Sequence, residues 1–304
     1  MYKRQLSELL FKARAPLQKF KGGAEKILSE LERLRGNFVF PLLYSWNRLI
    51  AKPDVDKIYD CLLQMGPQPK LDVIIFSRGG DPDQAYVIGN LLQSFASEKL
   101  TAIVPRFAKS AATLIVCAAD EVAMGPASEL GPIDLIIERV IDGERYDISV
   151  ISIMELMSMI KSGWFGDMAL KVVELIDKRL PLLELGDYGR LTEHTKQLAK
   201  KLLARRMWKE NVEHAERVAE ELCKTYKAHG AAIFSSDLEG KLKMAELGEE
   251  VWKLLWDLHK LWIDNVIEYE KSFPERAKYE PVDFKLGKGL VFCTQLVEAR
   301  APKG

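Results

Sequence analysis

Residues 71–81 read LDVIIFSRGGD, an apolar run followed at once by a polar turn with two glycines. Such a run predicts a buried β-strand that stops at a tight turn. Glycine at positions 79 and 80 lets the turn adopt positive φ and lets backbone N–H groups approach another molecule closely. No Lys-Ser or Lys-Thr pair follows the glycines, so the turn is not a phosphate-binding P-loop.

The chain on either side of this strand alternates between short apolar runs and helical patterns. The predicted strands are 37–43, 71–76, 100–104 and 121–124. The predicted helices are 24–35, 53–65, a segment from the glycine turn to residue 97, and 110–119. This alternation is typical of an α/β core with largely parallel strands.

Beyond Gly131-Pro132 the patterns become mainly helical. The predicted helices there are 149–162, 167–180, 190–228 and 240–272. We therefore expect an N-terminal helical extension at 1–36, a main domain at 37–265 whose second half is helical from about residue 149, and a C-terminal tail at 266–304.

Composition excludes several classes of protein. Lys plus Arg and Asp plus Glu are both 44, so the formal net charge is zero and a strongly basic nucleic-acid-binding protein is not indicated. The four cysteines stand far apart without a CxxC or His/Cys cluster, which predicts no zinc site and fits a reducing compartment. No cofactor is indicated.

The ends and the hydropathy of the chain suggest a cytoplasmic protein. No run approaches the roughly 18 apolar residues of a membrane span, and residues 1–21 lack the apolar core of a secretory signal. That segment has six basic residues on a helical pattern, so it is either a solvated helix or one that contacts a membrane surface or a partner. The basic residues are Lys3, Arg4, Lys12, Arg14, Lys19 and Lys21.

Residues 107–114, which read FAKSAATL, hold the second unusual feature. Ser110 stands where a strand ends and a small-residue helix begins. Serine there is a favoured helix N-cap and needs no further role. Alternatively, the small residues Ala111 and Ala112 leave room beside the hydroxyl, and backbone amides at the helix start suit a developing oxyanion. No GxSxG motif occurs, which disfavours an α/β-hydrolase elbow.

Five segments in order resemble the serine dehydrogenase proteinase family, which is related to the Clp protease proteolytic subunit and to signal peptide peptidase A. The matching segments are Ser77-Arg78-Gly79-Gly80, 108–114, 118–122, Leu130-Gly131-Pro132-Ile133-Asp134 and 227–233. The resemblance covers roughly residues 37–265. It implies a Clp/crotonase-type spiral of parallel strands and helices with added N- and C-terminal helices. It also implies peptide-bond hydrolysis by a serine nucleophile in a cytoplasmic homo-oligomer.

Carried over residue by residue, the resemblance places the nucleophile at Ser110. The oxyanion donors are then the amides of Gly79 or Gly80 and of Ala111. The family order of Ser, Asp and His selects Asp134 and His229 as the other members. The chain departs from the family at 111–112, where alanine follows the serine in place of glycine and a methyl group could narrow the pocket.

The general base has two candidates. His229 can act near neutral pH without a special environment. Lys161 ends an apolar helix that could keep its amine neutral, and related membrane-protein proteases use a Ser–Lys dyad. Asp120 is excluded because it lies about 15 Å along the helix from Ser110 at 1.5 Å per residue.

The remaining candidates near these residues are given structural roles. We expect Lys109 to point away from the neighbouring Ser110. His194, His214 and His259 fall on charged helix faces, where surface positions are expected.

Three hypotheses of function follow. The first is a serine peptidase that cleaves unstructured peptides, with no metal and no cofactor. The second is a catalytically inactive scaffold or peptide-binding protein of the same fold, which the alanines at 111–112 and the open choice of general base both favour. The third is a crotonase-type acyl-thioester enzyme, which shares the oxyanion site and does not need the serine.

Overall fold

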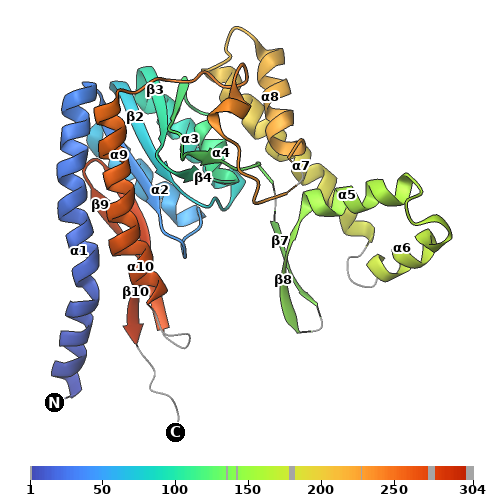
Figure 1. The fold of residues 1–304 in the computed structure, drawn as a ribbon, viewed down its shortest axis with the longest axis horizontal. Helices are drawn as coiled ribbons and strands as arrows, with labels where there is room; N and C mark the ends of the chain where they lie inside the picture. The colour runs from blue at the N-terminus through green and yellow to red at the C-terminus, as the bar shows by residue number, and fades with distance from the viewer. Residues whose placement is uncertain are drawn as a thin grey trace.

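A six-stranded, mostly parallel β-sheet forms the centre of the molecule (Figure 1). The computed structural model describes residues 2–134, 136–141, 143–177, 182–226, 228–272 and 278–298. The strand order is β5-β3-β2-β1-β10-β9, and all neighbours are parallel except β10 and β9. The strands are β1 (Phe38–Tyr44), β2 (Gln68–Phe76), β3 (Ala96–Val104), β5 (Glu121–Met124), β9 (Lys278–Leu286) and β10 (Gly289–Glu298).

Helices cover both faces of the sheet because its strands are apolar on both sides. Alternate residues of β1 divide between two cores: Phe40 and Leu42 face one, and Val39 and Leu43 face the other. The first core is closed by α2 (Lys52–Met65), α3 (Pro82–Phe95), α4 (Ala111–Val116), α7 (Leu182–Arg205) and α8 (Val212–Lys224). The second is closed by α1 (Tyr2–Arg35) and α9 (Glu249–Trp262). A π-turn at Ile263–Ile267 continues α9 into α10 (Glu268–Lys271).

An arm, residues 136–177, projects from this body beside the sheet (Figure 1). It consists of the antiparallel hairpin β7 (Ile136–Ile141) and β8 (Glu144–Ser149), then α5 (Val150–Lys161), a 3₁₀ turn at Gly166–Met168 and α6 (Ala169–Asp177). A small parallel pair of strands, β4 (Phe107–Ala108) and β6 (Glu129–Leu130), precedes the arm in the chain. A second 3₁₀ turn, Ser235–Leu238, follows α8.

The predicted α/β core with parallel strands is confirmed. The β7–β8 hairpin was not predicted, because its strands carry charged residues and the only local signal is Gly143, whose φ is 85°. The predicted helix 190–228 is instead two helices, α7 and α8, joined by a turn that ends at the cap residue Asn211.

The C-terminal segment does not match its description as a tail. Its described residues form the end of the π-turn, α10, β9 and β10, and β10 pairs in parallel with β1 inside the central sheet. Four consecutive residues of β10, Leu290, Val291, Phe292 and Cys293, are buried. Burial of these side chains against both cores explains why the segment folds into the domain.

The part of the chain that the structure describes contains no membrane-spanning helix and no metal-binding cluster. None of its helices has the length and apolar character needed to cross a membrane. No group of three or more His, Cys, Asp or Glu side chains is placed to bind a metal ion there. The four cysteines are free and buried.

Candidate active site

Ser110 occupies a strained position between β4 and α4. Its φ is 52° and its ψ is −120°, and it is the only non-glycine residue with positive φ among the described residues. Such a conformation costs of order 1–3 kcal/mol and persists only where the surroundings enforce it. Strained residues of this kind are concentrated at functional sites, so the backbone conformation of Ser110 indicates a functional role.

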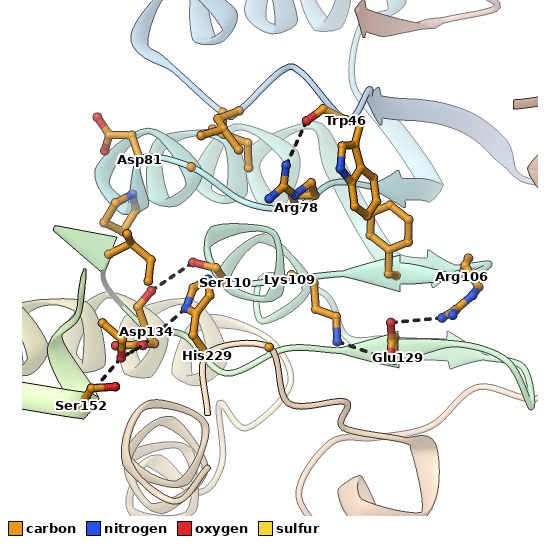
Figure 2. Close-up of a pocket in the computed structure, with 18 of the residues that line it drawn as sticks. Trp46, Arg78, Asp81, Arg106, Lys109, Ser110, Glu129, Asp134, Ser152 and His229 are labelled. Carbon is orange, nitrogen blue, oxygen red and sulfur yellow. Dashed lines mark hydrogen bonds and ion pairs between the residues drawn. The ribbon is translucent and has the colours of Figure 1, made fainter. Parts of the chain in front are cut away.

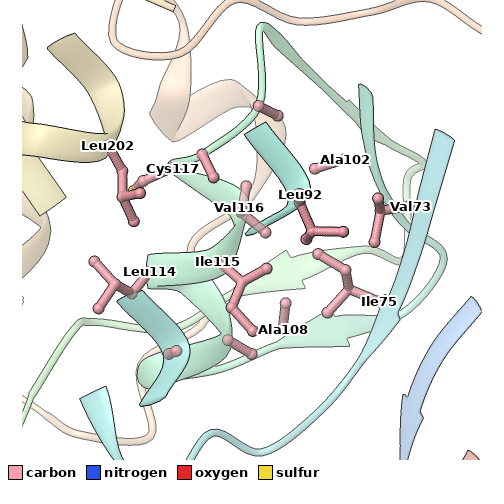
Figure 3. Packing of buried hydrophobic residues seen from close by; sticks show 14 of the residues in the cluster. Val73, Ile75, Leu92, Ala102, Ala108, Leu114, Ile115, Val116, Cys117 and Leu202 are labelled. Carbon is pink, nitrogen blue, oxygen red and sulfur yellow. The ribbon is translucent and has the colours of Figure 1, made fainter. Parts of the chain in front are cut away.

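The buried packing of α4 holds this conformation. All six residues of α4 are buried, and Leu114, Ile115 and Val116 lie within the core shown in Figure 3. The hydroxyl oxygen of Thr113 lies within hydrogen-bond distance of the carbonyls of Ala108 (2.9 Å) and Gly131 (2.7 Å), next to β4 and to the chain after β6. The helix therefore cannot shift to relax the serine.

Ser110 is not a helix cap. Its side chain makes no capping hydrogen bond, and its hydroxyl instead donates to the backbone carbonyl of Asp134 at 3.1 Å. The residue has neither the backbone angles nor the bond of an N-cap. The capping alternative raised by the sequence is thus not observed.

The glycine turn after β2 packs directly against Ser110. Gly79 has a φ of 103°, and a Cβ there would lie 2.8 Å from Ser110 Cβ and 3.0 Å from the amide nitrogen of Ala111. Gly80 has a φ of 146°, and a Cβ there would lie 2.4 Å from both the nitrogen and the oxygen of Ile50. Both positions therefore require glycine.

The two candidate oxyanion amides, those of Gly80 and Ala111, differ in access: Gly80 lines the cavity and Ala111 does not. The amide of Gly79 already donates to the Ser77 hydroxyl at 3.0 Å. Among the described residues, none accepts a hydrogen bond from the amides of Gly80 or Ala111. Of the two glycine donors that the sequence left open, the geometry favours Gly80.

The alanines that depart from the family pattern lie away from the cavity. Ala111 and Ala112 are 1% and 0% exposed and belong to the hydrophobic core. Neither lines the cavity in which Ser110 stands. Their methyl groups consequently leave that cavity open.

Asp134 and His229 lie on the side of Ser110 that is opposite the glycine turn (Figure 2). His229, in the loop after α8, places Nδ1 3.3 Å from Asp134 Oδ2. That separation is within ion-pair range, but the angle is not that of a formed hydrogen bond, and Nδ1 has no other partner in the described chain. The structure therefore brings together Ser110, Asp134 and His229, which are far apart in sequence.

The Asp134 carboxylate is buried and held by the first residues of α5, within the arm. Ser149, the N-cap of α5, donates its hydroxyl to Asp134 Oδ2 at 2.5 Å. The amide of Ile151 donates to Oδ1 at 3.4 Å. Neither donor is predicted from the sequence, although a serine before the apolar helix 150–161 is an N-cap signal.

Both lysines lie where the sequence did not predict them. Lys161 ends α5, is exposed, and does not line the cavity. Lys109, expected to point away, lines the cavity instead and reaches toward Glu129 (Figure 2). Its ammonium also donates to the carbonyls of Leu130 and Ala231. Burial lowers the pKa of Lys109, and the nearby Glu129 carboxylate opposes that shift.

His259 also differs from expectation. It was expected on the surface, but it is 8% exposed, lines the cavity and stacks on Phe76 at 5.4 Å. Burial, with a smaller contribution from the charge of Arg106, lowers its pKa to about 4. Its imidazole is consequently neutral at physiological pH. His194 is exposed and pairs with Asp83 at 2.7 Å.

The cavity has a volume of about 1120 Å³. Small-molecule pockets are commonly about 300–1,000 Å³, so this one has room for several residues of an extended peptide. The residues on its wall that matter here are Gly80, Lys109, Ser110, Asp134, Ser149 and His229.

A serine, a buried carboxylate beside a histidine and backbone amides around one cavity are the kinds of group that serine hydrolases use. The profile of the ClpP-like SDH-type serine proteinase family matches residues 37–255. The chain belongs to that family and is a serine-type peptidase. No curated protein matches the sequence.

Several solved structures are similar at low identity. One is the 1510-N membrane-bound stomatin-specific protease, with 15% identity, a TM-score of 0.44, and coverage of 72% of this chain and 84% of that chain. The ClpP protease catalytic domain from Plasmodium falciparum has 12% identity, a TM-score of 0.35, and coverage of 69% and 85%. ClpP1 from Listeria monocytogenes has 10% identity, a TM-score of 0.38, and coverage of 72% and 98%.

Proposed function

We propose that the enzyme cleaves unstructured peptides with Ser110 as nucleophile, His229 as general base and Asp134 as the residue that orients the imidazole. The single observation that supports this most is the position of Ser110. The only strained non-glycine residue of the described chain faces the Asp134–His229 pair across one cavity.

The proposed chemistry starts with the serine hydroxyl. It exchanges its present partner, the Asp134 carbonyl, for His229 Nε2 and attacks the scissile carbonyl as the imidazole takes its proton. The buried Asp134 carboxylate faces Nδ1 and stabilises the imidazolium that forms. Ser149 and the Ile151 amide donate to this carboxylate and hold it in place.

The free amides of Gly80 and Ala111 serve as the oxyanion donors. They bind the carbonyl oxygen once it carries negative charge, and their positions are already fixed by β2 and α4. The imidazolium then gives its proton to the leaving amine, which departs with the C-terminal part of the peptide. A water deprotonated by His229 hydrolyses the acyl-enzyme and restores the Ser110 hydroxyl.

Two observations favour a peptidase over the other two hypotheses. The burial of Ala111 and Ala112 removes one of the two grounds for an inactive scaffold, because their methyl groups do not enter the cavity. An acyl-thioester enzyme does not need the serine, so it gives no reason for the strain at Ser110.

The test is Ser110→Ala, assayed on fluorescein-labelled casein as an unstructured protein. We expect hydrolysis to fall to background while the melting temperature changes little, because the hydroxyl caps no helix. Ser94→Ala is the matched control, since Ser94 lies on α3 outside the cavity and donates to the Asn90 carbonyl. Wild-type turnover by Ser110→Ala would exclude Ser110 as the nucleophile.

We also propose that the enzyme is a homo-oligomer that associates through the arm. Large apolar side chains are unusually exposed there, and such patches commonly mark interfaces. They are Met154, Trp164, Met168, Leu170 and Leu175, between 49% and 78% exposed. Light scattering on purified protein should give a mass of two or more chains, whereas a mass of 34.5 kDa would contradict this.

A further inference from the structure

The ammonium group of Lys109 bridges three parts of the site. Lys109 directly precedes the nucleophile, and its side chain is 17% exposed. Nζ donates to the carbonyl of Leu130 at 3.1 Å and to that of Ala231 at 3.1 Å, and it lies 3.4 Å from Glu129 Oε2. Three acceptors match the three N–H bonds of an ammonium group.

One of these acceptors belongs to the loop that carries the histidine. Ala231 is two residues after His229, and the loop is pinned further along by the backbone pair of Ile233 with Leu130 (2.9 and 3.0 Å). Of these two attachments, the lysine bond is the nearer in sequence to His229. It joins the segment of the nucleophile directly to the segment of the base.

The protein makes room for this side chain. A Cβ at Gly131 would lie 2.5 Å from Lys109 Cδ and 3.2 Å from its Cα and Cβ. The stem of Lys109 thus lies in a slot that exists only because residue 131 has no side chain. Gly131 is also tied to α4, since its carbonyl accepts from Thr113 at 2.7 Å.

The same contacts argue against Lys109 as the base itself. A base needs a neutral amine with a free lone pair aimed at the serine. Here the nitrogen donates to two carbonyls beside a carboxylate, and these acceptors stabilise the charged form.

We propose that Lys109 is a positioning residue, which fixes the His229 loop against the nucleophile segment so that the imidazole meets the Ser110 hydroxyl. This inference rests on the proposed triad. It assigns the lysine no contact with substrate, and its effect is on the rate of the chemical step.

The first test replaces the ammonium with a neutral side chain of similar length. Lys109→Met should lower kcat on casein about 100-fold, the cost of a misplacement of about 1 Å, with KM little changed. Lys99→Met is the control, because Lys99 pairs with Glu121 at 2.8 Å outside the cavity and should keep full activity. An unchanged kcat in Lys109→Met would overturn the proposal.

A second variant guards against misfolding of the first. Gly131→Ala keeps the charge but crowds the lysine stem, so it should also lower kcat while KM stays constant. If both variants fold, by melting temperature and circular dichroism, and both keep the wild-type kcat, Lys109 has no positioning role.

A double-mutant cycle shows whether Lys109 acts through His229. The readout is the rate at which a fluorophosphonate probe labels Ser110 in the wild type, Lys109→Met, His229→Ala and the double variant. Residues that act as one unit give non-additive losses, so the double variant should be labelled about as slowly as His229→Ala. Additive losses would mean that Lys109 acts independently of the histidine, which contradicts the proposal.

The same cycle separates the two proposals. Normal labelling of His229→Ala would overturn the triad, and with it the role of Lys109. Slow labelling of His229→Ala with normal labelling of Lys109→Met would overturn only the role of the lysine.

Discussion

The two walls of the cavity are built in different ways. The nucleophile wall, residues 77–80 and 107–116, is fixed by buried backbone: every residue of α4 is buried, and the turn is held by backbone bonds such as Lys109 N to Ser77 O at 3.0 Å. The base wall, residues 134, 149–151 and 229–231, is held mainly by polar side chains. Its His229 side chain is 35% exposed.

The difference separates stability from turnover. The nucleophile wall can impose strain on Ser110 because a large hydrophobic core stands behind it. The base wall depends on single hydrogen bonds and ion contacts, each worth about 1–3 kcal/mol where a charge is involved. Changes in the base wall should therefore alter the rate. Changes in the nucleophile wall should alter the fold, except at Ser110 and Lys109, whose side chains line the cavity.

The largest effect is expected from removal of the base. His229→Ala should lower kcat by 100-fold to 10,000-fold, the usual range for general base catalysis, with a small change in melting temperature. Lys161→Met is the matched comparison and should keep full activity, because Lys161 is exposed and outside the cavity. A large loss in the lysine variant with an active His229→Ala would establish a Ser–Lys dyad instead.

A smaller effect, on stability, is expected from acid acting on His259, which lines the cavity outside the two walls. His259 packs on Phe76 with its pKa lowered to about 4, against about 6.5 in an unfolded chain. The unfolded state therefore binds the proton more tightly, and the stabilisation is complete above pH 6.5 and is lost as the pH falls towards 4. Between pH 7 and pH 5 this group should cost about 2 kcal/mol.

Urea unfolding at both pH values measures this, with His259→Leu as the reference variant that cannot titrate. The wild type should lose about 2 kcal/mol more than the variant between pH 7 and pH 5. Equal losses of unfolding free energy in the two proteins would show that His259 does not govern the acid sensitivity of the protein.

The smallest effect is expected from the support of the carboxylate. Ser149→Ala removes a hydrogen bond to a charged group and the cap of α5, so kcat should fall about tenfold and stability by about 1 kcal/mol. Ser162→Ala is the control, since Ser162 follows the same helix at its other end and donates to Met159. A tenfold loss of kcat in both variants, or in neither, would contradict the role of Ser149 in supporting the Asp134 carboxylate.

The sequence predicted the nucleophile wall better than the base wall, and the contrast between the walls explains why. Apolar runs followed by Gly79-Gly80 and by Ser110 are local signals, because strand, turn and helix each form from neighbouring residues. The strain at Ser110 has no such signal. It arises from packing of α4 and from the close approach of Gly79.

The base wall combines segments that are distant in sequence. Nothing local relates Ser149 to Asp134, or Lys109 to Ala231, and family resemblance alone pointed to His229. The apolar pattern of 151–160 suggested a buried Lys161, but α5 is only partly covered, so its terminal lysine reaches solvent. The charged hairpin β7–β8 was missed because its pattern is not that of a buried strand.

The most direct test of the triad is to locate the site of covalent labelling. The wild-type protein is treated with a fluorophosphonate probe at neutral pH, digested, and analysed by mass spectrometry, with Ser110→Ala treated in parallel. The proposed mechanism predicts one adduct, on Ser110, which is absent from the variant. An adduct on another serine, or a wild type that acquires none while it hydrolyses casein, would contradict the assignment of Ser110 as the nucleophile.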